Sequence, residues 1–126
     1  MKIKMYQVFK VLEIYKRVKE LKVPARVAYK FNKLCAKLSE DANFYDEEVN
    51  KIVNQYGVRE EDGSFKRTPE GAIQIQDGQL ITAQRAVDEL LNLDIEATDI
   101  EFTMEELDEL RLSIEDFNTM LPFLKE

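Results

Sequence analysis

Residues 24–56 read PARVAYKFNKLCAKLSEDANFYDEEVNKIVNQY, and this stretch decides the fold. Its apolar side chains advance by three or four residues, which places them on one side of an α-helix. They are Val27, Phe31, Leu34, Leu38, Ala42, Tyr45, Val49, Ile52 and Tyr56. Pro24 suits a first helical turn, and Gly57 favours a left-handed C-cap. The sequence therefore predicts one helix over residues 24–56, about 50 Å long.

A second periodic segment precedes this helix and predicts another over residues 3–21. Val23-Pro24 separates the two, because proline disfavours helical geometry in the residue before it. A helical hairpin results, in which the first helix covers about half of the second. The remaining half must pack on the C-terminal region or on another subunit. The sustained period also admits a coiled-coil dimer, but a compact bundle is favoured.

The chain beyond Gly57 mixes short extended and helical patterns. Residues 58–71 are rich in turn residues and predict a loop or a loosely paired excursion. Residues 72–76 and 93–98 alternate apolar and polar side chains, as half-buried strands do, and helical spacing covers residues 80–92. We expect the two extended segments to pair in a small sheet; if they run in the same direction, the helix between them is a crossover.

Two capping signals near the C-terminus predict short helices. Thr103 precedes Glu106 by three residues and Ser113 precedes Asp116, so helices are expected at about 104–110 and 114–121. Their apolar side chains would form a cap on the bundle: Leu107, Leu110, Ile114, Phe117, Met120, Leu121 and Leu124.

The predicted fold class is mainly α with a small β element (α+β). A long helical hairpin packs with a C-terminal strand-helix-strand unit and short capping helices. All 126 residues are expected to form a single domain. Within it, residues 1–57 form a basic-to-mixed helical hairpin, residues 58–71 a loop and residues 72–126 an acidic α+β subregion.

Charge is sorted along the chain. Residues 1–38 carry eleven Lys and Arg against two acids, a net +9, and residues 39–126 carry seven bases against 23 acids, a net −16, which together give −7. Arg26, Lys30, Lys33 and Lys37 share one stripe of the long predicted helix. Such a stripe suits phosphate contact, but it equally suits docking of acidic residues from the same chain or a neighbouring copy. We favour docking over direct nucleic-acid binding, because no groove-reading motif or stacking platform accompanies the stripe.

The candidate acidic interaction surface lies in the C-terminal region. It comprises Asp94, Glu96, Asp99, Glu101, Glu105, Glu106, Asp108 and Glu109. An ordered, uncompensated row of these carboxylates would mimic phosphates, whereas burial against the basic stripe would argue against mimicry.

Enzymatic chemistry finds little support in the composition. The chain has no His, so its one cysteine, Cys35, lacks the usual partner for thiolate activation, and no Gly-rich loop is present to hold a nucleotide. Adjacent acids such as Glu47 and Glu48 diverge on a helix and are better interpreted as a solvated face than as metal ligands. We therefore expect no enzyme, catalytic residue, cofactor or metal. No apolar stretch reaches membrane-spanning length and no signal peptide is evident, so a soluble, intracellular protein without a membrane partner is predicted.

The order of several short motifs resembles a family of small, uncharacterised tailed-phage proteins, a domain of unknown function typical of phages of Gram-positive bacteria. The motifs are Leu21-Lys22-Val23-Pro24-Ala25-Arg26-Val27-Ala28-Tyr29, Val53-Asn54-Gln55-Tyr56-Gly57 followed by Glu61-Asp62-Gly63, Glu89-Leu90-Leu91-Asn92, and Leu112-Ser113-Ile114-Glu115-Asp116. The resemblance extends from the first helix to the last. It implies a phage or prophage origin and no particular activity.

Two functional hypotheses follow. The first is a virion component of the tail or baseplate, or an assembly protein, that contacts other phage proteins or itself as a homo-oligomer. The second is an acidic, host-directed anti-defence inhibitor that occupies the nucleic-acid channel of a defence nuclease or another nucleic-acid-binding protein. Either protein would act in the host cytoplasm, and the first could also be incorporated in the virion.

Overall fold

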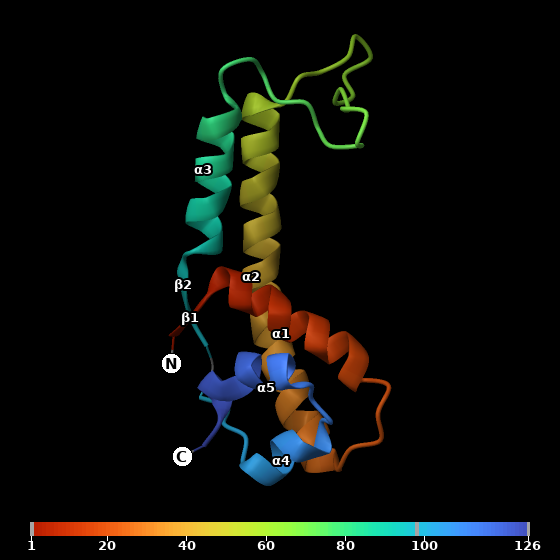
Figure 1. The fold of residues 1–126 in the computed structure, drawn as a ribbon, viewed down its shortest axis with the longest axis vertical. Helices are drawn as coiled ribbons and strands as arrows, with labels where there is room; N and C mark the ends of the chain where they lie inside the picture. The colour runs from red at the N-terminus through yellow and green to blue at the C-terminus, as the bar shows by residue number, and fades with distance from the viewer. Residues whose placement is uncertain (1, 98, 126) are drawn as a thin grey trace. The chain divides into compact units, whose positions relative to one another are not determined.

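The computed structural model describes residues 2–97 and 99–125 of the chain. The protein is mainly helical with a small two-stranded antiparallel sheet (Figure 1). The elements in chain order are β1 (Lys2–Lys4), α1 (Met5–Val18), α2 (Ala25–Tyr56), α3 (Leu80–Leu91), β2 (Asp94–Glu96), α4 (Met104–Glu109), α5 (Ile114–Met120) and a 3-10 turn (Leu121–Phe123). Two compact units emerge: Met1–Asn43 with Leu93–Glu126, and Phe44–Asn92.

Helix α2 confirms the long helix that the sequence predicts. It begins where the backbone carbonyl of Pro24 accepts hydrogen bonds from the N–H groups of Val27 and Ala28, both at 3.0 Å. The expected left-handed cap at Gly57 is wrong, because Gly57 is not among the residues with positive φ. A Cβ there would instead lie 2.6 Å from the Val53 carbonyl oxygen and 2.9 Å from the Phe65 ring. Close approach of the backbone to Phe65 therefore explains this glycine.

Helix α1 is shorter than the predicted helix over residues 3–21. Lys2–Lys4 is extended, and a turn follows Val18, whose carbonyl accepts the Leu21 N–H at 2.8 Å. The helix buries a stripe that comprises Met5, Val8, Val11, Ile14 and Val18. Its Tyr15 ring stacks on Phe31 of α2, with ring centroids 5.7 Å apart, and the Tyr15 hydroxyl donates to Asn32 at 2.8 Å. These contacts fasten α1 to the N-terminal part of α2.

The small sheet does not pair the segments that the sequence suggested. Strand β2 pairs antiparallel with β1, with Lys2 opposite Glu96, Ile3 opposite Ile95 and Lys4 opposite Asp94. The expected pairing of residues 72–76 with residues 93–98 is therefore wrong, and residue 98 lies outside the described residues. Both isoleucines are buried, and the Lys4 ammonium lies 2.7 Å from the Asp94 carboxylate. Apolar burial on one face and opposite charges on the other favour the observed partner.

Residues 57–76 form an excursion of three short extended segments. Isolated bridges join Gly57 to Ile75, Arg59 to Phe65, and Arg67 to Ile73. Each segment therefore pairs with the other two. Residues 72–76 thus pair with extended segments of this excursion and not with residues 93–97. Of the two arrangements predicted for residues 58–71, the structure has the paired excursion, whose tight turns use Gly63 and Gly71 at positive φ.

Helix α3 and the distal part of α2 belong to the second unit, where they line a shared apolar groove with Ile75 of the excursion. Figure 1 shows α3 alongside that part of α2. Ala83 is the buried residue of α3, while Leu80 and Ile81 are 53% and 70% exposed. This unit therefore leaves much of its apolar surface accessible to solvent.

Both short C-terminal helices are confirmed, with the caps that the sequence predicts. The Thr103 hydroxyl accepts the Glu106 N–H at 3.1 Å, and the Ser113 hydroxyl accepts the Asp116 N–H at 3.1 Å. Helix α4 ends at Glu109 and α5 at Met120. Their fully buried side chains join the core of the first unit, which includes Phe31, Leu34, Leu38, Phe102, Leu107, Leu110, Met120 and Phe123.

Candidate functional site

The first two residues of the basic stripe converge on a buried carboxylate. Glu106 of α4 is 2% exposed, and its two oxygens lie 2.8 Å from the Lys30 Nζ and 3.2 Å from the Arg26 Nε. Its Oε1 also accepts the backbone N–H of Thr103 at 2.9 Å, which completes the capping box of α4. One side chain thus starts a helix and fastens it to α2.

Lys30 also contacts the segment that precedes α4. Besides its bond to Glu106, its ammonium donates to the backbone carbonyl of Glu101 at 3.0 Å and lies 5.9 Å from the centre of the Phe102 ring. Phe102 in turn packs against Phe31 of α2, with ring centroids 5.9 Å apart. Lys30 therefore joins α2 to the segment before α4 as well as to α4 itself.

These contacts shift the acidity of Glu106. Burial raises its pKa, but the hydrogen bonds from Lys30 and the Thr103 N–H and the positive charges of Lys30 and Arg26 outweigh burial and lower the pKa from 4.5 to about 2. Glu106 is therefore ionised throughout the physiological pH range. The cluster is a structural ion pair that orients α4.

The other two residues of the basic stripe take no part in this docking. Lys37 bonds to Asp41, one turn along the same helix, at 2.8 Å. Lys33 is exposed, and no ion pair involves it among residues 2–97 and 99–125. The predicted docking stripe is thus divided: Arg26 and Lys30 meet the C-terminal region, whereas Lys33 and Lys37 face elsewhere.

The eight acids of the predicted interaction surface are likewise dispersed. Glu106 is buried, Asp94 pairs with Lys4, and Glu96 stands opposite Lys2 in the sheet. The hydrogen bond and charge of Lys4 lower the pKa of Asp94. The remaining five acids are exposed and, within the described part of the chain, form no ion pair: Asp99, Glu101, Glu105, Asp108 and Glu109. Three of these five belong to α4.

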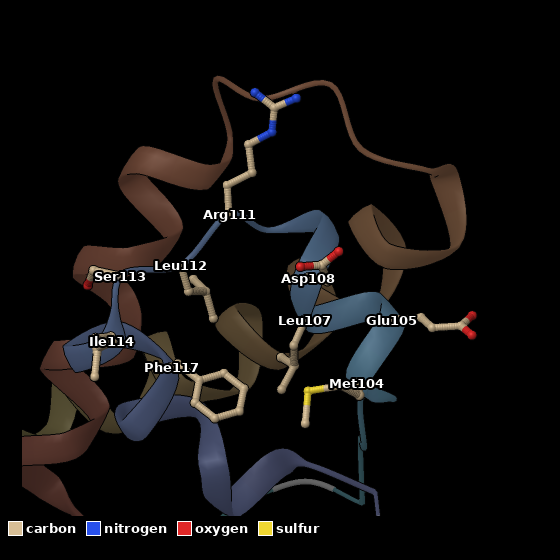
Figure 2. Close-up of a pocket in the computed structure, with 9 residues that line it drawn as sticks. All are labelled: Met104, Glu105, Leu107, Asp108, Arg111, Leu112, Ser113, Ile114 and Phe117. Atoms are coloured by element: carbon tan, nitrogen blue, oxygen red, sulfur yellow. The ribbon is translucent and has the colours of Figure 1, made fainter.

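An apolar groove of about 490 Å³ lies between α4 and α5, and two of these acids, Glu105 and Asp108, are among its lining residues (Figure 2). Its apolar lining comes from both helices and the link between them: Met104, Leu107, Leu112, Ile114 and Phe117. Ile114 is 84% exposed and Met104 is 55% exposed. The prediction that Ile114 packs in the apolar cap on the bundle is therefore wrong, because its position in the first turn of α5 directs it outward. Leu121, another predicted member of the cap, is also exposed, at 44%.

Polar residues border the groove. Glu105 and Asp108 of α4 lie on one side in Figure 2, and Ser113 and Arg111 belong to the link. Arg111 follows the end of α4 with φ of 52°, a left-handed conformation that is uncommon for a residue other than glycine. This turn separates α4 from α5, so that Leu112 and Ile114 come to line the groove.

Two apolar residues of this groove stand directly after helix N-caps, a sequence feature that helical periodicity alone does not identify. Met104 and Ile114 each directly follow an N-cap residue, Thr103 and Ser113. Short helices of six and seven residues cannot bury apolar side chains on every side. An apolar residue in the first turn of such a helix is therefore a candidate for an exposed contact.

Cys35 is a buried residue of α2 and does not line the groove. Burial raises the pKa of its thiol to about 12, so the nucleophilic thiolate is scarce at neutral pH. Among the residues that the structure describes, no group of three or more His, Cys, Asp or Glu is arranged to hold a metal ion. None of the described helices has the length and apolar character needed to cross a membrane.

Comparison with known proteins adds no family to this description. The chain matches no family model, no curated protein and no solved structure. The case for its function therefore rests on the geometry described above and on the sequence pattern.

Charge reversal at two positions of the stripe distinguishes docked from free basic residues. Lys30→Glu places a carboxylate beside Glu106 and should lower the free energy of unfolding by about 1–2 kcal/mol. Lys33→Glu, at an exposed position with no ion pair among the described residues, should change it by less than about 0.5 kcal/mol. Urea denaturation at low and high salt measures both, and the Lys30 effect should shrink as salt screens it. Equal losses in the two variants would contradict the division of the stripe.

Proposed function

We propose that this chain is a non-enzymatic phage protein that acts through protein–protein contacts, as a virion component of the tail or baseplate or as an assembly protein. Its partners are other phage proteins or further copies of itself. The exposed apolar groove between α4 and α5 carries this proposal, because a soluble domain keeps side chains such as Ile114 exposed at some cost unless a partner covers them. The phage setting is supported by the sequence resemblance alone.

The ion pairs beneath the groove support the same role. Glu106 anchors α4 to Arg26 and Lys30, and Asp116 of α5 pairs with Arg17 of α1. Both helices that line the groove are thereby fixed to the longer helices. A contact surface on rigid elements loses less conformational entropy on binding than one on loops. We propose that the helical hairpin and its two capping helices form one docking platform.

A second candidate is the acidic host-directed inhibitor of a defence nuclease or another nucleic-acid-binding protein. The five exposed acids without ion pairs among the described residues favour it. Glu106 and Asp94 weigh against an uncompensated row, since basic side chains neutralise both. The assembly role is therefore the stronger proposal.

Affinity capture from phage-infected host cells tests the proposal, with the wild-type chain, Ile114→Asp and a matched Ile81→Asp control. Ile81 is also exposed, at 70%, but belongs to α3 in the other unit. We expect mass spectrometry to identify tail or other virion proteins with the wild type and the control, and about tenfold less with Ile114→Asp. Recovery of a single host nuclease would favour the inhibitor instead. Equal recovery with all three baits would contradict the role of the groove.

A further inference from the structure

We propose that the groove between α4 and α5 binds a basic amphipathic segment of another protein, in which apolar side chains enter the groove and flanking Lys or Arg side chains pair with its acidic border. This inference rests on the proposed function and names the chemistry of the partner. Peptide recognition by apolar grooves commonly uses such segments.

The size and lining of the groove support an apolar anchor. Its volume, about 490 Å³, lies within the range of roughly 300–1,000 Å³ that is typical of binding pockets. Leu107 forms a buried wall, and Met104 and Ile114 present exposed edges. Met104 can adapt to different partner side chains, because its unbranched thioether chain is flexible. The groove therefore suits one or two aliphatic or aromatic side chains.

The border specifies the charge of the partner. Glu105 and Asp108 line the groove; they are three residues apart on α4 and therefore share one face of the helix. Glu109 follows Glu105 by one turn and adds negative charge to α4, although it does not line the groove. All three are exposed and form no ion pair within the residues described. Arg111 is the basic residue among those that line the groove. The net negative border attracts Lys and Arg and repels nucleic acid and anionic lipid.

A second copy of this chain is a poor fit for the same groove. The basic amphipathic segments of this chain are α1 and the N-terminal half of α2, but the apolar side chains of both are already buried in the core, from Met5 to Val18 and from Val27 to Leu38. Docking either segment of a neighbour would require those side chains to leave the core. The occupant is therefore a segment of a different protein.

A synthetic peptide provides a direct test with the full chain. The probe is a fluorescein-labelled 14-residue peptide whose leucines recur every three or four residues, with lysines at the other positions. Its control is a scrambled peptide of the same composition. Fluorescence anisotropy measures binding. We expect the helical peptide to bind at least about tenfold more tightly than the scrambled one, because only the former gathers its leucines on one face.

Two pairs of variants locate the bound peptide. Ile114→Asp should weaken binding about tenfold, and Ile81→Asp less than about twofold. The double variant Glu105→Lys, Asp108→Lys should weaken peptide binding by a similar factor. Its control is the double variant Glu60→Lys, Glu61→Lys, which reverses two exposed acids of the excursion and should have little effect on binding. Because all these positions are exposed, folding should be preserved, and circular dichroism checks it.

Several outcomes would overturn the inference. Equal losses in groove and control variants would show non-specific attraction between opposite charges. Preference for the scrambled peptide, or no binding at all, would exclude an amphipathic basic ligand. Self-association that Ile114→Asp abolishes in light scattering would assign the groove to a second copy. If affinity capture recovers a phage partner whose binding does not depend on Ile114, the proposed function stands and this inference fails.

Discussion

Ala42→Pro is expected to unfold the protein or to lower its free energy of unfolding by about 3 kcal/mol or more. Ala42 lies in the interior of α2 and is 8% exposed, so proline would remove a helical hydrogen bond and force its ring against the preceding turn at a packed position. Circular dichroism during thermal and urea denaturation measures the loss. The expected effect is large because α2 contributes residues to both compact units.

Ala42→Gly is the matched control for this substitution. Glycine keeps the backbone N–H and costs only about 1 kcal/mol in a helix interior. A soluble Ala42→Pro protein with undiminished helical signal would show that α2 is already interrupted near Ala42. The single long helix would then be wrong.

Glu106→Gln is the second large expected effect, a loss of roughly 2–3 kcal/mol at neutral pH. The substitution keeps the size of the side chain but removes the charge that compensates Lys30 and Arg26. The favourable pKa shift from 4.5 to about 2 sets the scale of the loss. Urea denaturation at pH 7 measures it, and Glu105→Gln, one residue away but exposed, is the control.

The same shift predicts how stability depends on pH. Because the pKa of Glu106 is lower in the folded than in the unfolded chain, its ionised form stabilises the fold fully above about pH 4.5, and this stabilisation is lost as the pH falls toward about 2. Glu106→Gln should flatten that part of the profile relative to the Glu105→Gln control. An unchanged slope would show that Glu106 does not drive the acid sensitivity.

Local patterns in the sequence predicted the helices well. The unbroken spacing from Val27 to Tyr56 gave α2, and the Thr103 and Ser113 caps gave the starts of α4 and α5. These features depend on residues that are neighbours along the chain, so periodicity and capping chemistry identify them.

Pairing between distant segments was harder to predict. Residues 72–76 and 93–98 have similar alternation, so pattern alone could not show that they pair with different partners. The stronger signal was complementarity between Lys2-Ile3-Lys4 and Asp94-Ile95-Glu96, which matches opposite charges around buried isoleucines. Choosing between such pairings requires long-range contacts that no local pattern contains.

The candidate site was only partly accessible from the sequence. The stripe of Arg26 and Lys30 predicted docking to an acid, but Glu106 could not be singled out from its acidic neighbours before α4 was oriented. The exposure of Ile114 depends on where α5 lies against the core, which helical spacing does not determine. Sequence analysis therefore found the charges that position the groove but not the groove itself.

Site-specific photo-crosslinking in phage-infected cells tests most directly whether the groove is a protein-contact surface. A photoreactive phenylalanine analogue replaces Ile114 in one variant and Ile81 in a matched variant, since both positions are exposed. Under the proposed assembly role, we predict a discrete adduct with a phage protein from position 114 and none from position 81. The absence of an adduct at position 114, or the same adduct from both positions, would contradict the account.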